Sequence, residues 1–100
     1  MRVSNMTSAK GNDVPNQFEI TGVTIKNPKD RRCNITGTMF QSYSSNIAFR
    51  SYGDGTFLDE QYWDYSVTTG RYRNQFLGED IAHTRARIAS GEYKLVNLNK

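Results

Sequence analysis

The side chains most often used in catalysis are scarce in this sequence. His83 is the only histidine and Cys33 is the only cysteine. A nucleophile or general base needs a partner side chain within hydrogen-bond reach, and neither residue belongs to a motif that supplies one. One cysteine and one histidine also fall short of the four ligands of a usual zinc site. We therefore expect a non-enzymatic protein with no catalytic residue, cofactor or metal, in which His83 is solvated and Cys33 is a half-buried apolar residue.

The acidic and glycine-rich stretches do not match known sites either. The four carboxylates in the middle of the chain lack the spacing of a calcium loop. Gly53-Asp54-Gly55 reads as a turn rather than a phosphate loop, because no Lys-Ser/Thr pair and helix follow it. We interpret the carboxylates as a solvated edge, formed by Asp54, Asp59, Glu60 and Asp64.

Two groups of basic residues are the candidate binding sites. The first is a loop that contains Arg31 and Arg32 together with Lys26 and Lys29. The second is the outer surface of two predicted helices, which carry arginine and no lysine, and arginine can hold a carboxylate or phosphate through two parallel hydrogen bonds. The residues expected to bind a partner there are Arg71, Arg73, Asn74 and Arg87. The alternative for both groups is an ordinary solvated surface, a turn in the first case and a helix back in the second.

The charge is modest and unevenly distributed. The chain of 100 residues has a formal net charge of +3, with basic residues in excess at both ends and acidic residues in excess between about 33 and 66. Such a pattern permits a local anion site. It falls short of the continuous basic face expected of a dedicated duplex binder.

The elements that must position these residues follow from hydrophobic periodicity. Alternation predicts four strands, the first beginning at Gln17 and containing a bulge at Gly22, where the parity of the apolar residues shifts. The other three fall at about residues 34–42, 47–50 and 56–58, separated by turns at 27–30, 44–46 and 53–55. Residues 93–98 fit either a final strand or an extended tail.

Two helices follow the strands. Ser66 is a suitable cap for a helix over about Val67–Leu77, which Gly78 would end, and a second helix fits Asp80–Ala89. On the first, Tyr65, Thr69, Tyr72 and Phe76 share one face and are assigned to the core. The residues expected to point away from the core are Arg71, Asn74, His83 and Arg87.

These elements predict an α+β fold in which a small antiparallel sheet of about four strands packs against two helices. Residues 1–16 are polar and aperiodic, so we expect a flexible N-terminal arm, followed by a single α+β domain over residues 17–100. No apolar run approaches the roughly 20 residues of a membrane span, and the N-terminus lacks the apolar region of a secretory signal. The predicted core comprises Phe18, Ile20, Ile35, Phe49, Tyr72 and Phe76.

The stretch YWDYSVTTGRYRNQFLGE, residues 62–79, resembles a segment of small uncharacterised proteins of tailed bacteriophages, with the pattern YWDYS-x-TT-x-RYRN-x-FLGE. The tetrapeptides at residues 40–43 and 90–93 are also similar to that family, so the resemblance covers roughly residues 38–97. It implies a short phage product that works in the cytoplasm of a bacterial host. Compact proteins of this kind frequently bind and disable a host factor.

Two functions fit these features best, and an enzyme ranks third behind them. The leading one is a non-enzymatic phage binding protein that inhibits a host defence or takeover target, with a host bacterial protein or complex as its partner. The alternative is a nucleic-acid or nucleotide binder that uses the arginine-rich helix surface, which would show steep salt dependence because phosphate contacts release counterions. Neither requires a membrane, and both are compatible with a homodimer.

Overall fold

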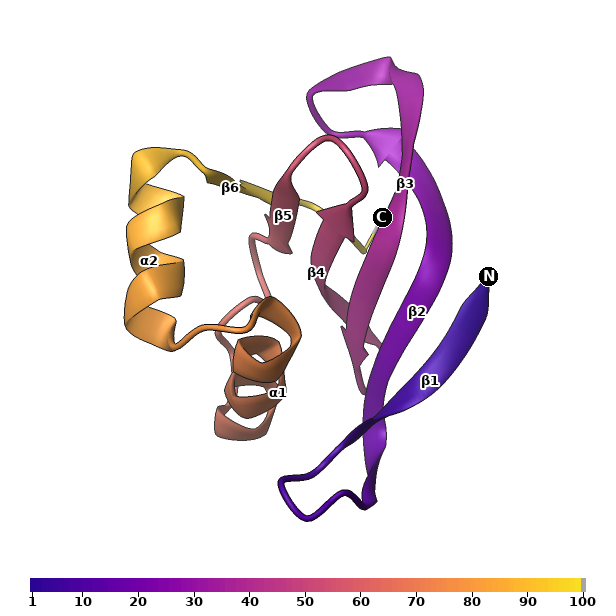
Figure 1. The fold of residues 1–100 in the computed structure, drawn as a ribbon. Helices are drawn as coiled ribbons and strands as arrows, with labels where there is room; N and C mark the ends of the chain where they lie inside the picture. Colours follow the sequence, from indigo (N-terminus) through magenta and orange to yellow (C-terminus); the bar gives the residue numbers. More distant parts are fainter. Residues whose placement is uncertain (100) are drawn as a thin grey trace.

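The computed structural model describes residues 1–99 and consists of one sheet with two helices (Figure 1). The six strands lie in the sheet in the order β1-β2-β3-β4-β5-β6. Neighbouring strands are antiparallel except for β5 and β6, which are parallel. The α+β class is thus confirmed, whereas the sheet is mixed and six-stranded rather than antiparallel with about four strands. The elements are β1 (Arg2–Thr7), β2 (Asp13–Asn27), β3 (Asp30–Ser42), β4 (Ser45–Ser51), β5 (Thr56–Asp59), α1 (Val67–Leu77), α2 (Ile81–Ser90) and β6 (Tyr93–Val96).

Strand β1 replaces the flexible arm expected over residues 1–16. It pairs with β2 through partners such as Val3 with Ile20 and Asn5 with Phe18. Met6 is buried in the core, while the other residues of β1 are exposed. An edge strand that buries one side chain in six carries no apolar alternation, which is why its sequence resembles a loose polar segment.

Both helices belong to the connection between β5 and β6. Parallel neighbours need a long crossover, and here α1 and α2 supply it (Figure 1). The segment at residues 93–98 therefore begins as a strand, β6, on the second edge of the sheet. Beyond it, Leu98 is buried and its backbone N–H donates to the Asp59 carboxylate at 2.8 Å.

Local signals set the ends of the helices and the shape of the hairpins. The Ser66 hydroxyl accepts from the Thr69 N–H at 3.1 Å, and Gly78 ends α1 with φ +73°, as predicted. The second helix begins one residue after its cap, Asp80, whose carboxylate accepts from the His83 N–H at 2.9 Å. Gly22 has φ +72° at the register shift between β2 and β3, so the predicted bulge is confirmed.

The sheet is apolar on both faces. The face toward the helices buries Phe40, Ile47 and Leu58 against Tyr72 and Phe76 of α1. The opposite face buries a second cluster, formed by Ile35, Met39, Phe49, Phe57 and Leu98. Four predicted core residues are buried: Ile35, Phe49, Tyr72 and Phe76. Phe18 and Ile20 are only partly buried, because β2 lies near the edge of the sheet, where one neighbour is the exposed β1.

Candidate functional site

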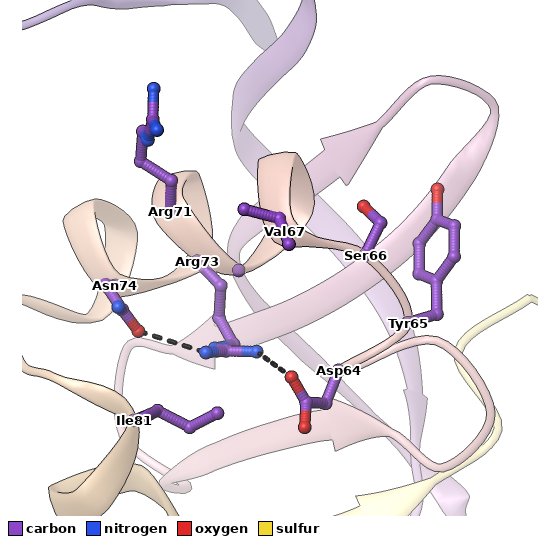
Figure 2. A pocket seen from close by; sticks show the side chains of 9 residues that line it. Asp64, Tyr65, Ser66, Val67, Arg71, Arg73, Asn74 and Ile81 are labelled. Atoms are coloured by element: carbon purple, nitrogen blue, oxygen red, sulfur yellow. Dashed lines mark hydrogen bonds and ion pairs between the residues drawn. The ribbon is translucent and has the colours of Figure 1, made fainter.

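A shallow depression of about 610 Å³ lies beside α1 (Figure 2). The loop before α1 forms one wall, the first two turns of α1 form another, and Ile81 at the start of α2 closes the third side. Three of the six predicted site residues line it: Arg71, Arg73 and Asn74. They play different parts there.

Arg73 is buried rather than exposed, which corrects the expectation that it lies on the outer helix surface. Only 1% of its surface is accessible. Its guanidinium donates to the Trp63 carbonyl at 2.7 Å, to the Asp64 carboxylate at 3.2 Å and to the Asn74 side-chain carbonyl at 3.1 Å. It also lies 5.3 Å from the centre of the Trp63 ring. Arg73 thus ties the preceding loop to α1, and a planar fork with several donors suits that role.

The position of Arg73 agrees with helical periodicity, although its charge suggested the opposite. It lies four residues after Thr69 and three before Phe76, both of which are buried. Those spacings place all three on one face of a helix. Helical spacing therefore predicts the burial of Arg73 correctly, whereas the usual preference of arginine for solvent predicts the wrong side of the helix.

Asp64 shares its carboxylate between two arginines. One oxygen accepts from Arg73 and the other accepts from the exposed Arg85 at 3.3 Å. The Asp64 side chain is 32% exposed. The depression therefore contains a negative group beside its positive ones, and a phosphate placed there would meet a carboxylate.

Two apolar side chains in the depression were missed or misassigned from the sequence. Val67, the first residue of α1, is 84% exposed, and Tyr65 is 46% exposed although it was assigned to the core. Tyr65 precedes the cap Ser66, whose backbone is extended with φ −152°, so helical spacing does not reach it. Val67 lies outside the helix face shared by Thr69 and Tyr72, so helical spacing could have predicted its exposure. Figure 2 shows Tyr65 and Ser66 at one end of the depression and Arg71 directed away from Arg73 and Asp64.

Arg87 belongs to a separate network that holds α2 against β6. Its guanidinium donates to Glu79 at 2.8 Å and to Glu92 at 2.6 Å. Glu79 also accepts from the Thr84 hydroxyl at 2.7 Å and from the Tyr93 hydroxyl at 3.1 Å. Arg87 therefore serves the fold, and it is not the unengaged surface arginine that the sequence predicts.

The network shifts the pKa values of Glu79 and Tyr93, and it raises that of Arg87 through the hydrogen bond to Glu79. Burial by itself would raise the pKa of Glu79, yet the hydrogen bonds from Thr84, Arg87 and Tyr93 outweigh it and hold that pKa below its ordinary value of 4.5. Burial, reinforced by the hydrogen bond to Glu79, raises the pKa of Tyr93 to about 12. Both shifts favour the ionised carboxylate beside a neutral phenol.

Replacing Glu79 with glutamine is expected to lower the melting temperature at pH 7 but not in strong acid. Because the pKa of Glu79 is lower in the folded chain than in the unfolded one, its ionised form stabilises the fold above pH 4.5, and this contribution is lost as the pH falls through the folded-state value. Melting curves from pH 7 to pH 2 should show the two proteins converging. Glu92→Gln, which removes a partner of Arg87 alone, should have the smaller effect at pH 7, and a constant gap at all pH values would contradict the assignment.

The basic loop lies at the turn between β2 and β3, away from α1 (Figure 1). Arg32 is 89% exposed and pairs with Asp30 through two hydrogen bonds of 3.0 and 3.3 Å. Arg31 lines a different pocket, together with the C-terminal residues Asn97 and Leu98. The six predicted site residues thus lie in three separate places instead of forming one surface.

Among residues 1–99, the other polar residues considered from the sequence show no arrangement typical of a catalytic site. Cys33 is exposed rather than half-buried, and His83 contacts its own helix cap Asp80 at 2.7 Å. Asp59 is buried instead of belonging to a solvated edge, and it accepts from the backbone N–H groups of Gln61 and Tyr62 as well as Leu98.

Within residues 1–99, no three His, Cys, Asp or Glu side chains come together as metal ligands would. None of the helices over the same residues has the length and apolar character needed to cross a membrane.

The chain belongs to a family of unknown function (DUF8033), whose profile matches residues 1–92. The match includes β1, both helices and the whole depression. No curated protein and no solved structure matches the chain.

Proposed function

We propose that this chain is a non-enzymatic binding protein of bacteriophage origin that contacts a host bacterial protein through the depression beside α1 and thereby inhibits a host defence or takeover target. The observation that carries the proposal is the exposure of Val67 and Tyr65 beside Arg71 in that depression. Val67 is 84% exposed, so covering it with a partner removes apolar surface from water and stabilises the complex. Tyrosine and arginine are also the residue types most enriched among interface hot spots.

The charge distribution favours a protein partner over nucleic acid. Among the four arginines of the helices, Arg73, Arg85 and Arg87 already bind carboxylates. Arg71 is exposed and makes no ion pair with residues 1–99. Binding to a nucleic-acid backbone needs several unpaired cations in a row. A surface with one available arginine, exposed apolar groups and a carboxylate suits the mixed chemistry of a protein interface.

The phage and host setting has a separate source of support. Eight of the nine residues that line the depression fall within residues 62–79, the stretch that resembles small phage proteins. The ninth is Ile81. The surface proposed to meet the partner is therefore built from the segment that suggested the biological setting.

Replacing Val67 with aspartate is expected to abolish capture of a host protein while leaving the fold intact. A charge at this position would have to be desolvated under the partner, which is costly. The matched control is Thr68→Asp, because Thr68 is the next residue of α1, is exposed and does not line the depression. Both substitutions place a negative charge in the first turn of the helix, where it is tolerated. The measurement is affinity capture from nuclease-treated bacterial lysates by the wild type, Val67→Asp, Thr68→Asp and Arg71→Ala, with melting curves for each.

The proposal predicts that capture survives nuclease and high salt. Val67→Asp should abolish it, Arg71→Ala should weaken it, and Thr68→Asp should leave it unchanged. Equal capture by all four proteins would place the interface elsewhere. Capture that disappears with nuclease or falls steeply with salt would instead support the nucleic-acid alternative.

A further inference from the structure

A second pocket, of about 390 Å³, lies between the tip of the β2–β3 hairpin and the C-terminal segment. It is more enclosed than the depression beside α1, and its volume falls within the roughly 300–1,000 Å³ of small-molecule sites. Its lining combines three apolar and three polar side chains: Ile25, Pro28 and Leu98 with Lys26, Arg31 and Asn97. An apolar wall with a few polar groups is the composition expected of a site for a small organic ligand.

Both walls of the pocket are held in place. At the hairpin, the Asn27 side chain accepts from the Lys29 N–H at 2.9 Å and fixes the turn. At the other wall, Leu98 is held by Asp59 at 2.8 Å, and its carbonyl accepts from the Asn46 side chain at 3.0 Å. The two walls come from segments more than 60 residues apart in the sequence. Each is fixed by its own hydrogen bonds, and Ile25 of one wall packs against the apolar cluster that contains Leu98 of the other. A preformed site of this kind lowers the ordering cost of binding.

The pocket is electropositive. Arg32 and Asp30 neutralise each other through two hydrogen bonds at the turn. Lys26 and Arg31 make no ion pair with the described part of the chain, residues 1–99. The Lys29 ammonium lies 5.8 Å from the centre of the Phe57 ring, so a third cation is turned toward the same side of the sheet. Two unpaired cations among the lining residues match a doubly charged anion, and the arginine fork can hold two of its oxygens.

We infer that this pocket binds a small organic phosphate, with the phosphate between Lys26 and Arg31 and the organic body against Ile25, Pro28 and Leu98. The site is distinct from the depression beside α1 and does not depend on the function proposed for that surface. The apolar wall should make an organic phosphate bind more tightly than inorganic phosphate, because inorganic phosphate has no apolar area to bury. A carboxylate of similar shape has one negative charge and two acceptor oxygens, so it should bind more weakly than the phosphate.

The test is a titration followed by the amide resonances of the 15N-labelled full chain, with phenyl phosphate as the probe. Inorganic phosphate, benzoate and phenol are titrated in parallel, and adenosine monophosphate shows whether a larger body is accepted. Phenyl phosphate should shift the amides of Ile25, Lys26, Asn97 and Leu98 and should bind more tightly than the three simpler compounds. Arg31→Ala and Lys26→Ala should each weaken it by about tenfold or more, since each removes a hydrogen bond between charged groups.

The matched control is Arg32→Ala, which removes the adjacent arginine that does not line the pocket. It should leave phenyl phosphate affinity within about twofold of the wild type. Equal weakening by Arg31→Ala and Arg32→Ala would show general electrostatic attraction and overturn the site. Equal affinity for inorganic phosphate and phenyl phosphate would overturn the role of the apolar wall. Absence of shifts at Asn97 and Leu98 would overturn the location.

Discussion

Replacing Phe76 with alanine is expected to lower the free energy of unfolding by about 3–5 kcal/mol, the usual cost of truncating a buried phenylalanine. Phe76 is 4% exposed and joins α1 to the centre of the sheet. Its ring stacks on Phe40 with the ring centres 5.7 Å apart, and the Arg50 guanidinium lies 4.7 Å from its centre. The substitution would leave a cavity between layers that cannot close without moving the helix.

Urea denaturation of the variant measures this loss, and Gln75→Ala is its control. Gln75 is the preceding residue of α1 and is exposed, so its replacement tests the helix without opening the core. We expect Gln75→Ala to stay within about 0.5 kcal/mol of the wild type. A midpoint for Phe76→Ala close to that of the wild type would mean that α1 does not pack on the sheet as described.

Replacing Asp64 with alanine is expected to cost about 2–3 kcal/mol, and adding Arg73→Met is expected to recover part of that loss. Removing Asp64 leaves the buried Arg73 cation without a carboxylate, and a buried charge that has lost its partner is strongly unfavourable. The loss should be smaller than the roughly 3–5 kcal/mol of a fully buried pair, because Asp64 is 32% exposed. Methionine removes the charge and replaces the guanidinium beside the Trp63 ring with a thioether, which packs well against aromatic rings.

A double-mutant cycle in urea, built from Asp64→Ala, Arg73→Met and the combined variant, measures the coupling. Arg85→Ala is the control, because it removes the exposed partner of Asp64 and should cost about 0–1 kcal/mol. The combined variant should be more stable than Asp64→Ala alone. A cycle in which the two losses simply add would show that Arg73 does not depend on Asp64.

Local chemistry in the sequence determined a good part of this fold. Ser66 and Gly78 specify the ends of α1 because a side-chain oxygen and a left-handed backbone are needed there, whatever the helix later packs against. Gly22 marked the bulge for the same kind of reason. The spacing of Tyr72 and Phe76 identified the buried face of α1, because residues four apart in the sequence lie on the same face of a helix.

The edges of the sheet were decided by tertiary structure. Strand β1 exposes five of its six residues, and none of the four residues of β6 is fully buried. Their sequences therefore carry no clear alternation, and pairing with a neighbour is what makes them strands. The parallel pairing of β5 with β6 depends on where the two helices return the chain. The hydrophobic periodicity within either strand therefore does not predict that the two strands pair in parallel.

The roles of the charged residues were also decided by tertiary structure. The sequence showed where arginines lie along the chain, but Arg73 is enclosed by Trp63 and Asp64, and Arg87 is engaged by Glu79 and Glu92. Arg71 and Arg31 are exposed and have no carboxylate within ion-pair distance among residues 1–99. The availability of a charge depends on its neighbours in space, because an ion pair forms between groups that folding brings together from different elements. Residue type and spacing therefore named the candidates, and packing decided which of them remain available to a partner.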